Sequence, residues 1–444
     1  MNTSFIRKLI YLCIALILMG AAVFAYWFYF VRNTTIIDNS GGNSAPTSFS
    51  PFGTTNTPVT NKPKPTNNGN VSTTTVTTTD VKLPILRQLS ATPVGGYENN
   101  TITASTTIIR WIDRGRGNIY EANSSTSLIT TISNTLVPRI YESWWNKNLD
   151  IFTAQYLGTS GDSITTVLTN ILKNPQYSTS TAYLNSRNSS STQSSANQVT
   201  ETQYQLKGKT ISGNVIALAV SPKKDRLLLV SNENNHAIGY LSKFDGTGQS
   251  QLFNIPLSQI IVDWPEDNTI AITTKAGASY AGYLYFVNVK TGAIKQILGD
   301  IVGLATKVSR DASYVFYSRT NPDNNTFMDF VLNVKSGKTT EAIFRTLADK
   351  CVWSKKTTNN VYCGVSSTIA ESVYPDDWYL GKVAFADSIW KMDMKNEQAS
   401  KVYDLLNQGN VLIDSYNLQL SDNDSFMYFM NKNDLSLWSL DITN

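Results

Sequence analysis

The feature of this 444-residue chain that most restricts its fold is a phrase that recurs at nearly constant spacing. The phrase is a short strand-like run, a polar turn, and then a run of β-branched and aromatic residues. By subtraction of residue numbers, the steps between its instances are 40, 76, 43, 45, 45 and 67. Repetition at this period is typical of an array of one supersecondary unit. The seven instances begin at Ser105, Trp145, Ser221, Trp264, Ser309, Ser354 and Ser421.

A second repeated phrase follows most instances of the first. NVKTGAIKQILG, residues 288–299, returns as NVKSGKTTEAIF, residues 333–344. Each phrase alternates in polarity, turns at Thr291-Gly292 or Ser336-Gly337, and alternates again, as a β-hairpin does. Two hairpins in 40 to 45 residues make a four-stranded unit, which is the content of one blade of a β-propeller.

The end of the repeat region indicates how the ring closes. The last unit, from about Val411, shows only three strands before Asn444, whereas the strand-like KLPILRQLS at residues 82–90 precedes the first unit. We expect residues 82–90 to supply the missing outer strand, because an open sheet edge must be covered. The sequence therefore predicts an all-β fold, a seven-bladed propeller over residues 82–444. The alternatives are a six-bladed ring, if residues 91–133 form an irregular unit, and a β-sandwich, which seldom keeps so regular a step.

The first 32 residues differ in kind from the rest of the chain. Leu9 to Val31 is an uncharged apolar run, preceded by two basic residues and ending in five consecutive aromatic residues. This pattern predicts a transmembrane signal anchor over residues 1–32, with the amino terminus cytoplasmic and the propeller extracytoplasmic. The alternative is a signal peptide cleaved near Val23-Phe24-Ala25. In both interpretations the body of the protein is exported.

Residues 33–81 are dominated by Thr, Asn, Ser, Gly and Pro and contain almost no large apolar residue. Such a stretch cannot bury enough surface to offset the entropy lost on ordering. We therefore expect a disordered linker, which would hold the body on the order of 35 to 40 Å from the membrane if it behaves as a coil.

Three turns of the repeat carry a family resemblance. Ser221-Pro222-Lys223-Lys224, Trp264-Pro265-Glu266-Asp267 and Ser309-Arg310-Asp311-Ala312 are similar to the Ser-Pro-Asp-Gly turn of WD40-like and TolB-like propeller repeats, without its Asp-Gly ending. The body from residue 82 to 444 resembles membrane-anchored propeller proteins of bacteria with small genomes. Tyr374 to Gly381, with Phe385-Ala386-Asp387, is the most specific shared stretch. The resemblance implies partner binding through loops on one face of the ring, and it implies no catalytic residue.

The residue inventory argues against most enzyme chemistry. Histidine occurs once, at His236, and no Gly-x-Ser-x-Gly nucleophile elbow is present. A net charge of +4 without basic clusters disfavours nucleic-acid binding. We expect a non-catalytic protein with no cofactor and no metal. The alternative is a propeller hydrolase that uses carboxylates near the central channel.

Two insertions interrupt the repeat, and binding sites of repeat proteins lie where repeats vary. Residues 174–198 have the composition of a disordered loop. The second insertion, residues 366–386, is placed between the second and third strands of its blade. It gathers aromatic and acidic residues that suit a peptide or glycan, although only two possible oxygen ligands are too few for calcium. The alternative, which we favour, is that Trp378 and Tyr379 fold back to cap their own blade. The candidate binding residues are Tyr374, Asp376, Asp377, Trp378 and Tyr379.

Two further motifs leave alternatives open. Cys351 and Cys363 flank a turn and fall opposite each other, so outside the cytosol they either form a cross-strand disulfide or remain two buried thiols. Arg114-Gly115-Arg116-Gly117 is suggestive of a phosphate-binding loop, but strand-like sequence follows it where such a loop needs a helix. We interpret it as a hairpin turn.

The sequence as a whole predicts an extracytoplasmic propeller anchored in the membrane by its amino-terminal helix. Its expected role is a non-catalytic module that binds a protein, peptide or glycan of the cell envelope, or a structural part of an envelope assembly.

Overall fold

The computed structural model describes residues 83–158, 163–174, 204–211 and 213–443. The predicted signal anchor at residues 1–32, the predicted linker at residues 33–81 and most of the first insertion lie outside these ranges. Within them, no helix has both the length and the apolar character needed to cross a membrane.

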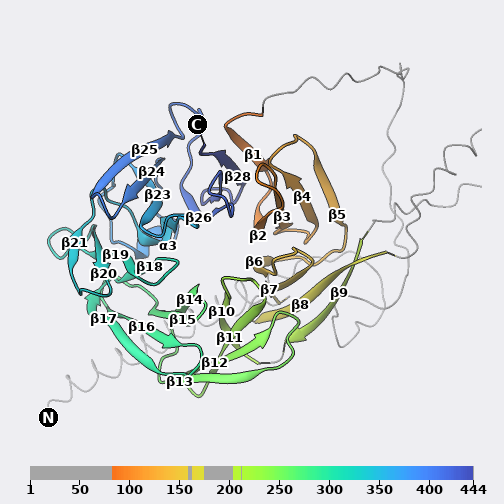
Figure 1. Ribbon diagram of the computed structural model, residues 1–444, viewed down its shortest axis with the longest axis horizontal. Coiled ribbons are helices and arrows are strands. Elements are labelled where there is room, and N and C mark those ends of the chain that lie inside the picture. The colour runs from red at the N-terminus through yellow and green to blue at the C-terminus, as the bar shows by residue number, and fades with distance from the viewer. Residues whose placement is uncertain (1–82, 159–162, 175–203, 212, 444) are drawn as a thin grey trace, which may run out of the picture. The chain divides into compact units, whose positions relative to one another are not determined.

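Within the described residues the strands form seven four-stranded antiparallel sheets arranged around a central axis (Figure 1). The prediction of a seven-bladed propeller is confirmed, and the six-bladed ring and the β-sandwich are excluded. We number the blades in chain order from the sheet that begins with β2. In each of the first six blades the four strands follow one another in sequence.

The first blade comprises β2 (Val94–Thr101), β3 (Thr107–Asp113), β4 (Ile119–Asn123) and β5 (Ile129–Ser133). The second comprises β6 (Ile140–Trp145), β7 (Ile151–Leu157), β8 (Ile164–Lys173) and β9 (Tyr204–Ile211). The third comprises β10 (Val215–Val220), β11 (Arg226–Glu233), β12 (His236–Lys243) and β13 (Ser250–Ile255). The fourth comprises β14 (Ile260–Glu266), β15 (Thr269–Thr274), β16 (Ala281–Asn288) and β17 (Ile294–Val302).

The fifth blade comprises β18 (Ala305–Val308), β19 (Tyr314–Thr320), β20 (Phe327–Asn333) and β21 (Thr339–Glu341). The sixth is preceded by the 3-10 helix η3 (Ala348–Lys350) and comprises β22 (Cys351–Trp353), β23 (Asn360–Ser366), β24 (Asp387–Asp393) and β25 (Gln398–Asp404), with the short helix α3 (Asp376–Tyr379) between β23 and β24. The seventh comprises β26 (Ser415–Leu420), β27 (Phe426–Asn431), β28 (Leu437–Asp441) and the amino-terminal strand β1 (Leu86–Ser90).

The recurring serine of the first phrase has a local structural cause. In the turns between first and second strands, the side-chain oxygen of Ser221 accepts a hydrogen bond from the backbone N–H of Arg226 at 3.0 Å, and Ser309 does the same for Tyr314 at 2.9 Å. This bond substitutes for a backbone partner that the tight turn cannot supply. The fourth residue of each turn has a left-handed backbone, with φ of +56° at both Lys224 and Ala312. The Gly of the Ser-Pro-Asp-Gly pattern would suit this conformation best, which explains why the present turns read as degenerate forms of it.

The second repeated phrase forms the outer hairpins of the fourth and fifth blades, β16–β17 and β20–β21, as predicted. Gly292 and Gly337 both have φ of +70° in their turns. A residue with a side chain would be strained there, so the glycine recurs with the hairpin.

The ring is closed by β1, which pairs with β28 in the register Leu86 with Leu440 and Gln88 with Trp438. This pairing completes the seventh blade and covers its outer edge. The prediction that residues 82–90 supply the missing strand is confirmed for the part that is strand, Leu86 to Ser90.

The hydrophobic core is divided among the contacts between blades. Seven clusters of buried residues each combine side chains from two neighbouring blades, so that every blade packs on both sides. An eighth cluster lies beneath the 366–386 insertion. Sheets buried on both faces explain the apolar and aromatic runs of the second strands, such as Leu227 to Val230 in β11.

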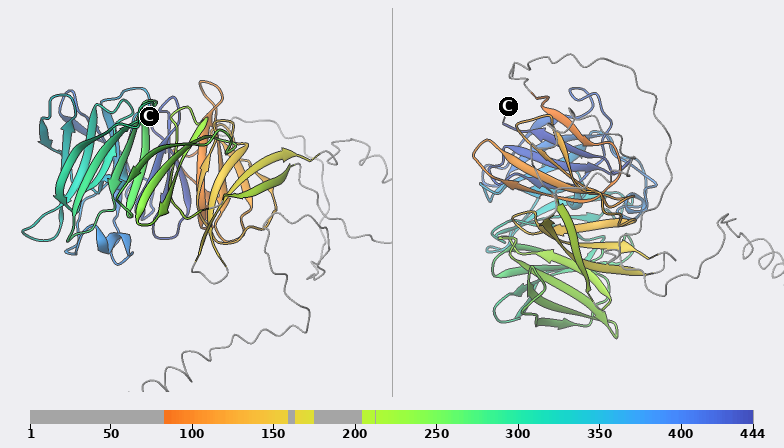
Figure 2. Two further views of the ribbon diagram at one scale, coloured as in Figure 1. Left: turned by 90° about the horizontal axis from the view of Figure 1, so that it is seen from below. Right: turned by 90° about the vertical axis from the view of Figure 1, so that its right-hand side faces the viewer.

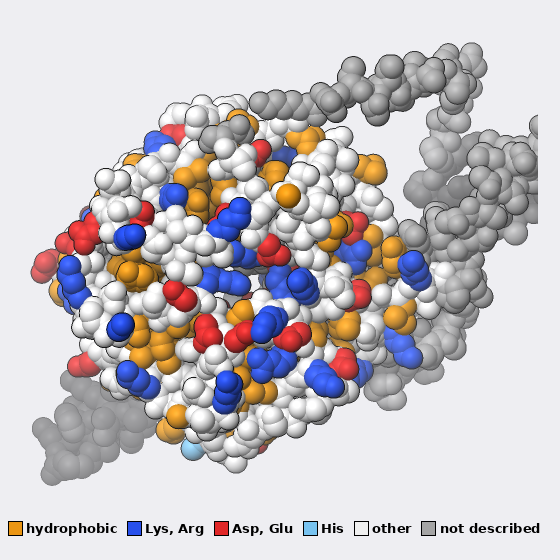
Figure 3. Space-filling model, viewed as in Figure 1, with side chains coloured by type: hydrophobic (Ala, Val, Ile, Leu, Met, Phe, Trp, Pro, Cys, Tyr) orange, Lys and Arg blue, Asp and Glu red, His pale blue; other side chains and the backbone are white. Residues whose placement is uncertain are grey.

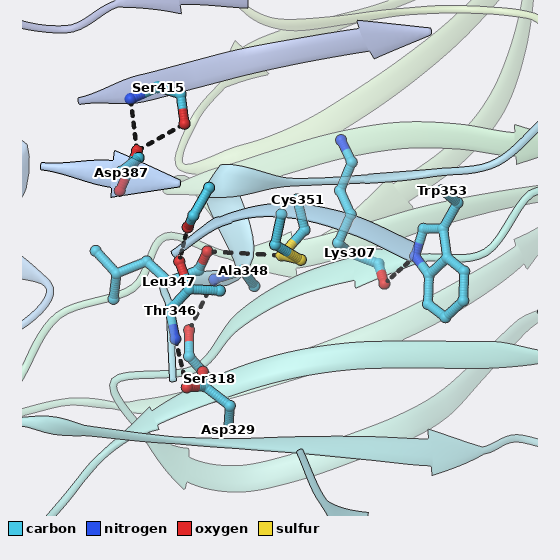
Figure 4. The surroundings of a disulfide bond; sticks show 12 residues. Lys307, Ser318, Asp329, Thr346, Leu347, Ala348, Cys351, Trp353, Asp387 and Ser415 are labelled. Carbon is cyan, nitrogen blue, oxygen red and sulfur yellow. Dashed lines mark hydrogen bonds between the residues drawn. A yellow bond between two sulfur atoms is a disulfide. The ribbon is translucent and has the colours of Figure 1, made fainter. Parts of the chain in front are cut away.

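The two cysteines of the sixth blade form a disulfide between paired residues of β22 and β23, with Cα atoms 4.1 Å apart. The bond lies in the core between the fifth and sixth blades. Close by, the indole Nε1 of Trp353 donates a hydrogen bond to the carbonyl oxygen of Lys307 at 2.9 Å, which ties the two blades together (Figure 4).

We expect Cys351 and Cys363 to be bonded in protein isolated from an oxidising compartment, because the two residues are paired across β22 and β23 and disulfides persist outside the reducing cytosol. Since both side chains are buried, the test is alkylation of denatured protein followed by peptide mass spectrometry. Both cysteines should escape alkylation before reduction and be alkylated after it. Alkylation of the two residues without reduction would contradict the bond.

Candidate binding site at the mouth of the central channel

The loops of the propeller are divided between two faces. Because successive strands run antiparallel, the turns after first strands lie on one face and the loops after second strands lie on the other. We call the first the turn face and the second, which carries residues 366–386, the insertion face. Figure 2 shows α3 projecting from one face of the ring.

The inner strands enclose a cavity of about 660 Å³ that runs along the channel. Figure 3 shows the face opposite α3, the turn face, where a hollow at the centre of the ring is bordered by both basic and acidic side chains. The ionisable and aromatic side chains that line the cavity near the insertion face are Arg114, Tyr141, Glu142, Asp349, Trp378, Tyr379, Tyr416 and Lys432.

The 366–386 insertion forms part of the rim of this mouth. Tyr374 is fully buried and lies edge-on to Phe327, with ring centroids 5.1 Å apart, in a cluster that also holds Phe385 and Trp378. Its hydroxyl donates to the carbonyl oxygen of Ala370 at 3.0 Å. The aromatic residues of the insertion therefore build a small core of their own.

Both acidic residues of the candidate set are engaged within the protein. Asp376 accepts a hydrogen bond at 2.6 Å from the backbone N–H of Ala278, in the loop after β15 of the fourth blade. Asp377 accepts bonds from Lys382 at 2.7 Å and from the backbone N–H of Val373 at 3.0 Å, and these bonds lower its pKa to about 2. The carboxylates hold the loop in shape.

The remaining two residues connect the insertion to the ring. The Trp378 side chain is only 3% exposed, and its Nε1 donates to Asp414 at 2.9 Å, just before the seventh blade. Tyr379 is 39% exposed, lines the cavity, and donates through its hydroxyl to Asp349 at 2.8 Å. The insertion thus folds back as we favoured, but its contacts reach the fourth, fifth and seventh blades as well as its own. Partner binding by these five residues stays a prediction.

A buried ionic cluster supports the insertion from below. Lys350 of η3 is 1% exposed and forms ion pairs with Asp414 and, at 2.7 Å, with Asp387 at the start of β24. Burial raises the pKa of Asp387, while the ammonium group of Lys350 opposes that shift. The Lys350 ammonium also lies 5.5 Å from the ring centre of Trp378. The cluster joins η3, the sixth blade, the seventh blade and the insertion at one point.

The carboxylates that line the channel differ in whether another side chain forms an ion pair or a hydrogen bond with them. Glu98 pairs with Lys224 at 2.9 Å near the turn face, Asp263 lies 3.8 Å from Lys307, and Asp349 accepts from Tyr379. Glu142 forms no ion pair or hydrogen bond with any residue that the structure describes. It is open to the water of the channel but surrounded by the channel wall, and this desolvation raises its pKa to about 7, with Lys275 acting in the opposite direction.

Sequence reasoning missed the residues of this mouth. Arg114 was interpreted as part of a hairpin turn, which is correct, since it lies between β3 and β4. Its side chain nevertheless lines the cavity, as do Glu142 and Tyr416 near the starts of β6 and β26. The available signal for Glu142 and Tyr416 was a polar or tyrosine residue near the start of the first strand of a unit, whereas Arg114 lies in a hairpin turn. No group of metal-ligating side chains large enough to hold an ion occurs among the described residues.

Neither a scan of protein-family models nor a search of curated proteins finds a match to this chain. Similar solved structures include TolB from Acinetobacter baumannii, at 10% identity and a TM-score of 0.39 over 76% of this chain and 64% of that one. The GH74 xyloglucanase from Xanthomonas campestris gives 10% identity and a TM-score of 0.49 over 81% and 54% of the two chains. An oligogalacturonate lyase from Vibrio parahaemolyticus gives 9% and 0.44 over 79% and 98%.

At these identities and scores the comparisons carry no argument about activity. The chain also spans only 64% of the TolB chain and about half of the xyloglucanase. What its own strand order establishes is the architecture, so the protein is an all-β, seven-bladed propeller with TolB among its structural neighbours.

Proposed function

We propose that this protein is a non-catalytic binding or assembly module of the cell envelope, which docks a protein partner on the insertion face of its propeller. The apolar run from Leu9 to Val31 would anchor it in the membrane with the amino terminus inside and the ring outside. The Thr- and Asn-rich residues 33–81 would hold the ring away from the bilayer.

One observation carries the proposal: a preformed cavity opens beside a rim that the protein has made rigid. The insertion is held by its own core, by Asp376 and by the Lys350 cluster. The rim still presents apolar surface, since Leu380 is 69% exposed and Tyr280, in the loop that Asp376 contacts, is 75% exposed. A fixed apolar rim around a pocket suits protein docking, because little ordering is required on binding.

The distribution of the carboxylates also supports a non-catalytic role. Those that line the channel come from different blades, and Glu98, Asp263 and Asp349 are each engaged with a lysine or a tyrosine. Carboxylate hydrolysis of glycosides needs a second free carboxyl group within about 5 to 10 Å of the first. The structure supplies one candidate, Glu142, without a free partner among the described residues.

The raised pKa of Glu142 is the observation that favours the hydrolase alternative, because a general acid must hold its proton near neutral pH. A hydrolase would turn over polysaccharide or peptide substrates, and Glu142→Gln would abolish that turnover. We expect the purified propeller to release no product from a panel of envelope polymers. Release that Glu142→Gln abolishes would favour the enzyme.

The docking proposal is tested by a photo-cross-linking residue placed at Leu380 in intact cells. The matched control places the same residue at Leu128, which is also 69% exposed but lies next to the outermost strand of the first blade. We expect one defined envelope adduct from position 380 and none from position 128. Equal adducts from both positions, or none from position 380, would count against docking on the insertion face. A membrane-impermeant competitor that blocks the adduct would support the extracytoplasmic placement.

A further inference from the structure

The insertion-face mouth carries two basic side chains that form no ion pair with a carboxylate among the described residues. Arg114, in the turn between β3 and β4, and Lys432, just after β27, both line the cavity. Neither forms an ion pair with any residue in the described ranges. Of the carboxylates near the same mouth, Asp349 is held by Tyr379 and Glu142 is partly protonated near neutral pH. Arg114 and Lys432 are therefore available to pair with an anionic ligand.

The backbone that carries Arg114 is held in place. Its N–H donates to the carbonyl oxygen of Pro93 at 2.8 Å, and the turn closes with Gly117 N–H bonded to Asp113 at 2.8 Å. Gly96 of β2 lies so close to β6 that a Cβ atom there would be 2.7 Å from the backbone nitrogen of Ser143. This close approach brings the Arg114 turn of the first blade beside Tyr141 and Glu142 of the second.

The side chains around Arg114 are hydrogen-bond donors of the kind that hold an anion. Arg114 acts electrostatically on the hydroxyls of both Tyr141 and Tyr416. Burial raises the pKa of each of these tyrosines to about 12, so both stay protonated at neutral pH. Tyr141 already donates to Gln155 at 2.7 Å, whereas the Tyr416 hydroxyl has no hydrogen-bond partner among the described residues. Arg114 and Tyr416 line the same cavity. A guanidinium can bind both oxygens of a carboxylate, and a tyrosine hydroxyl can donate a further hydrogen bond to it.

We propose that this mouth binds a carboxylate of an acidic peptide segment, with Arg114 as the principal contact and Tyr416 as a hydrogen-bond donor. The inference rests on the docking function proposed above and names the chemistry that the partner presents to it. Each contact belongs to a different blade, so the site exists only in the closed ring.

The positions of the two indole side chains in the lining favour a peptide over an acidic sugar as the source of the carboxylate. Sugars are recognised by stacking on an accessible aromatic face. Trp378 is 3% exposed, and the ammonium groups of Lys432 and Lys350 lie 5.0 and 5.5 Å from its ring centre. Trp144, the other indole in the lining, packs against the core between the second and third blades. Neither indole therefore has a free face on which a sugar could stack.

The pH dependence has a definite sign. Glu142 acts electrostatically on Tyr141 of its own strand and on Tyr416 of β26, and Lys275 in the loop after β15 acts on Glu142. The other charged groups that line the same mouth are Arg114, Asp349 and Lys432. Between pH 6 and 8 both tyrosines stay neutral. Burial also raises the pKa of Asp349, but that carboxylate accepts a hydrogen bond from Tyr379, so we assign the change of charge in this range to Glu142. Above a pKa of about 7 it is an anion that repels the bound carboxylate, and below that value it is neutral. Binding should therefore tighten as the pH falls from 8 to 6.

The test uses the purified full chain and a fluorescein-labelled peptide of six glutamates with an amidated carboxyl terminus, followed by fluorescence anisotropy. A peptide of six glutamines and a galacturonate trisaccharide are the comparison probes. We expect saturable binding of the glutamate peptide alone, weakened about 10- to 100-fold by Arg114→Gln through loss of a charge-assisted hydrogen bond. Arg116→Gln is the matched control, since Arg116 is exposed in the same turn, and it should change the Kd less than about twofold.

Measuring the affinity at two pH values distinguishes binding at a specific site from general electrostatic attraction. Wild-type affinity should be higher at pH 6 than at pH 8, and Glu142→Gln should bind equally at both pH values. Equal weakening by the two arginine variants, or a pH dependence that survives Glu142→Gln, would overturn the assignment, and so would tighter binding of the trisaccharide. Failure of the glutamate peptide alongside a defined adduct from position 380 would overturn this inference and leave the docking function standing.

Discussion

Replacement of Lys350 by methionine is expected to lower the free energy of unfolding by about 3 to 5 kcal/mol, because it leaves Asp387 and Asp414 buried without their counter-charge. Lys350 pairs with both carboxylates, and all three side chains are at most 1% exposed. Trp378 donates to Asp414, so the loss should also loosen the insertion. A change of this size is a large part of the stability of a typical domain. Denaturant unfolding followed by tryptophan fluorescence measures it.

The matched control is Lys356→Met, which removes an exposed lysine six residues away and should have little effect. Burial already raises the pKa of Asp387, so in the Lys350→Met protein that carboxyl should take up a proton more readily. The destabilisation should therefore be smaller at pH 5 than at pH 8. Adding Asp387→Asn and Asp414→Asn should recover part of the lost stability. A Lys350→Met protein as stable as Lys356→Met would show that the cluster contributes no net stability.

Deletion of residues 83–90 is the second change with a large expected effect. It removes β1, opens the seventh blade, and exposes the edge of β28. Leu89 is 4% exposed in the core between the seventh and first blades, and Leu86 packs against the core between the sixth and seventh. Full burial of Leu89 contributes about 1.5 to 3 kcal/mol and half-buried Leu86 adds less, so we expect a loss of about 2 to 4 kcal/mol and a markedly lower Tm.

The control for this deletion removes eight residues, 60–67, from the Thr- and Asn-rich sequence before the propeller. It should leave the thermal melt unchanged. Size-exclusion chromatography should also show self-association of the 83–90 deletion, because an unpaired strand edge recruits other chains. An unchanged melt without association would mean that the ring closes without β1.

The repeat could be interpreted from sequence because its cause is local. The Ser221 and Ser309 turns recur since a side-chain oxygen must satisfy a backbone N–H a few residues away, and Gly292 and Gly337 recur since their turns need a left-handed backbone. Such requirements act within a few residues, so they leave a periodic trace in one chain. The blade number, the insertion points and the closing strand followed from that trace.

The site could not be derived in the same way. The sequence directed attention to Tyr374, Asp376, Asp377, Trp378 and Tyr379, because these residues are adjacent in the chain. In the structure most of them hold the insertion in place, and Tyr379 lines the channel. Nothing in the local pattern distinguishes an aromatic residue that packs inward from one that faces a ligand.

The sequence by itself determined the unit, its repetition and the order of the strands, because alternation and turn chemistry are properties of neighbouring residues. Only the tertiary structure brought together Arg114, Glu142 and Tyr416, which belong to the first, second and seventh blades. Residues 114 and 416 become neighbours in space when β1 pairs with β28 and the last blade meets the first. The desolvation that raises the pKa of Glu142 likewise comes from the surrounding walls of a closed ring. The channel and its chemistry are therefore properties of closure, which no single blade contains.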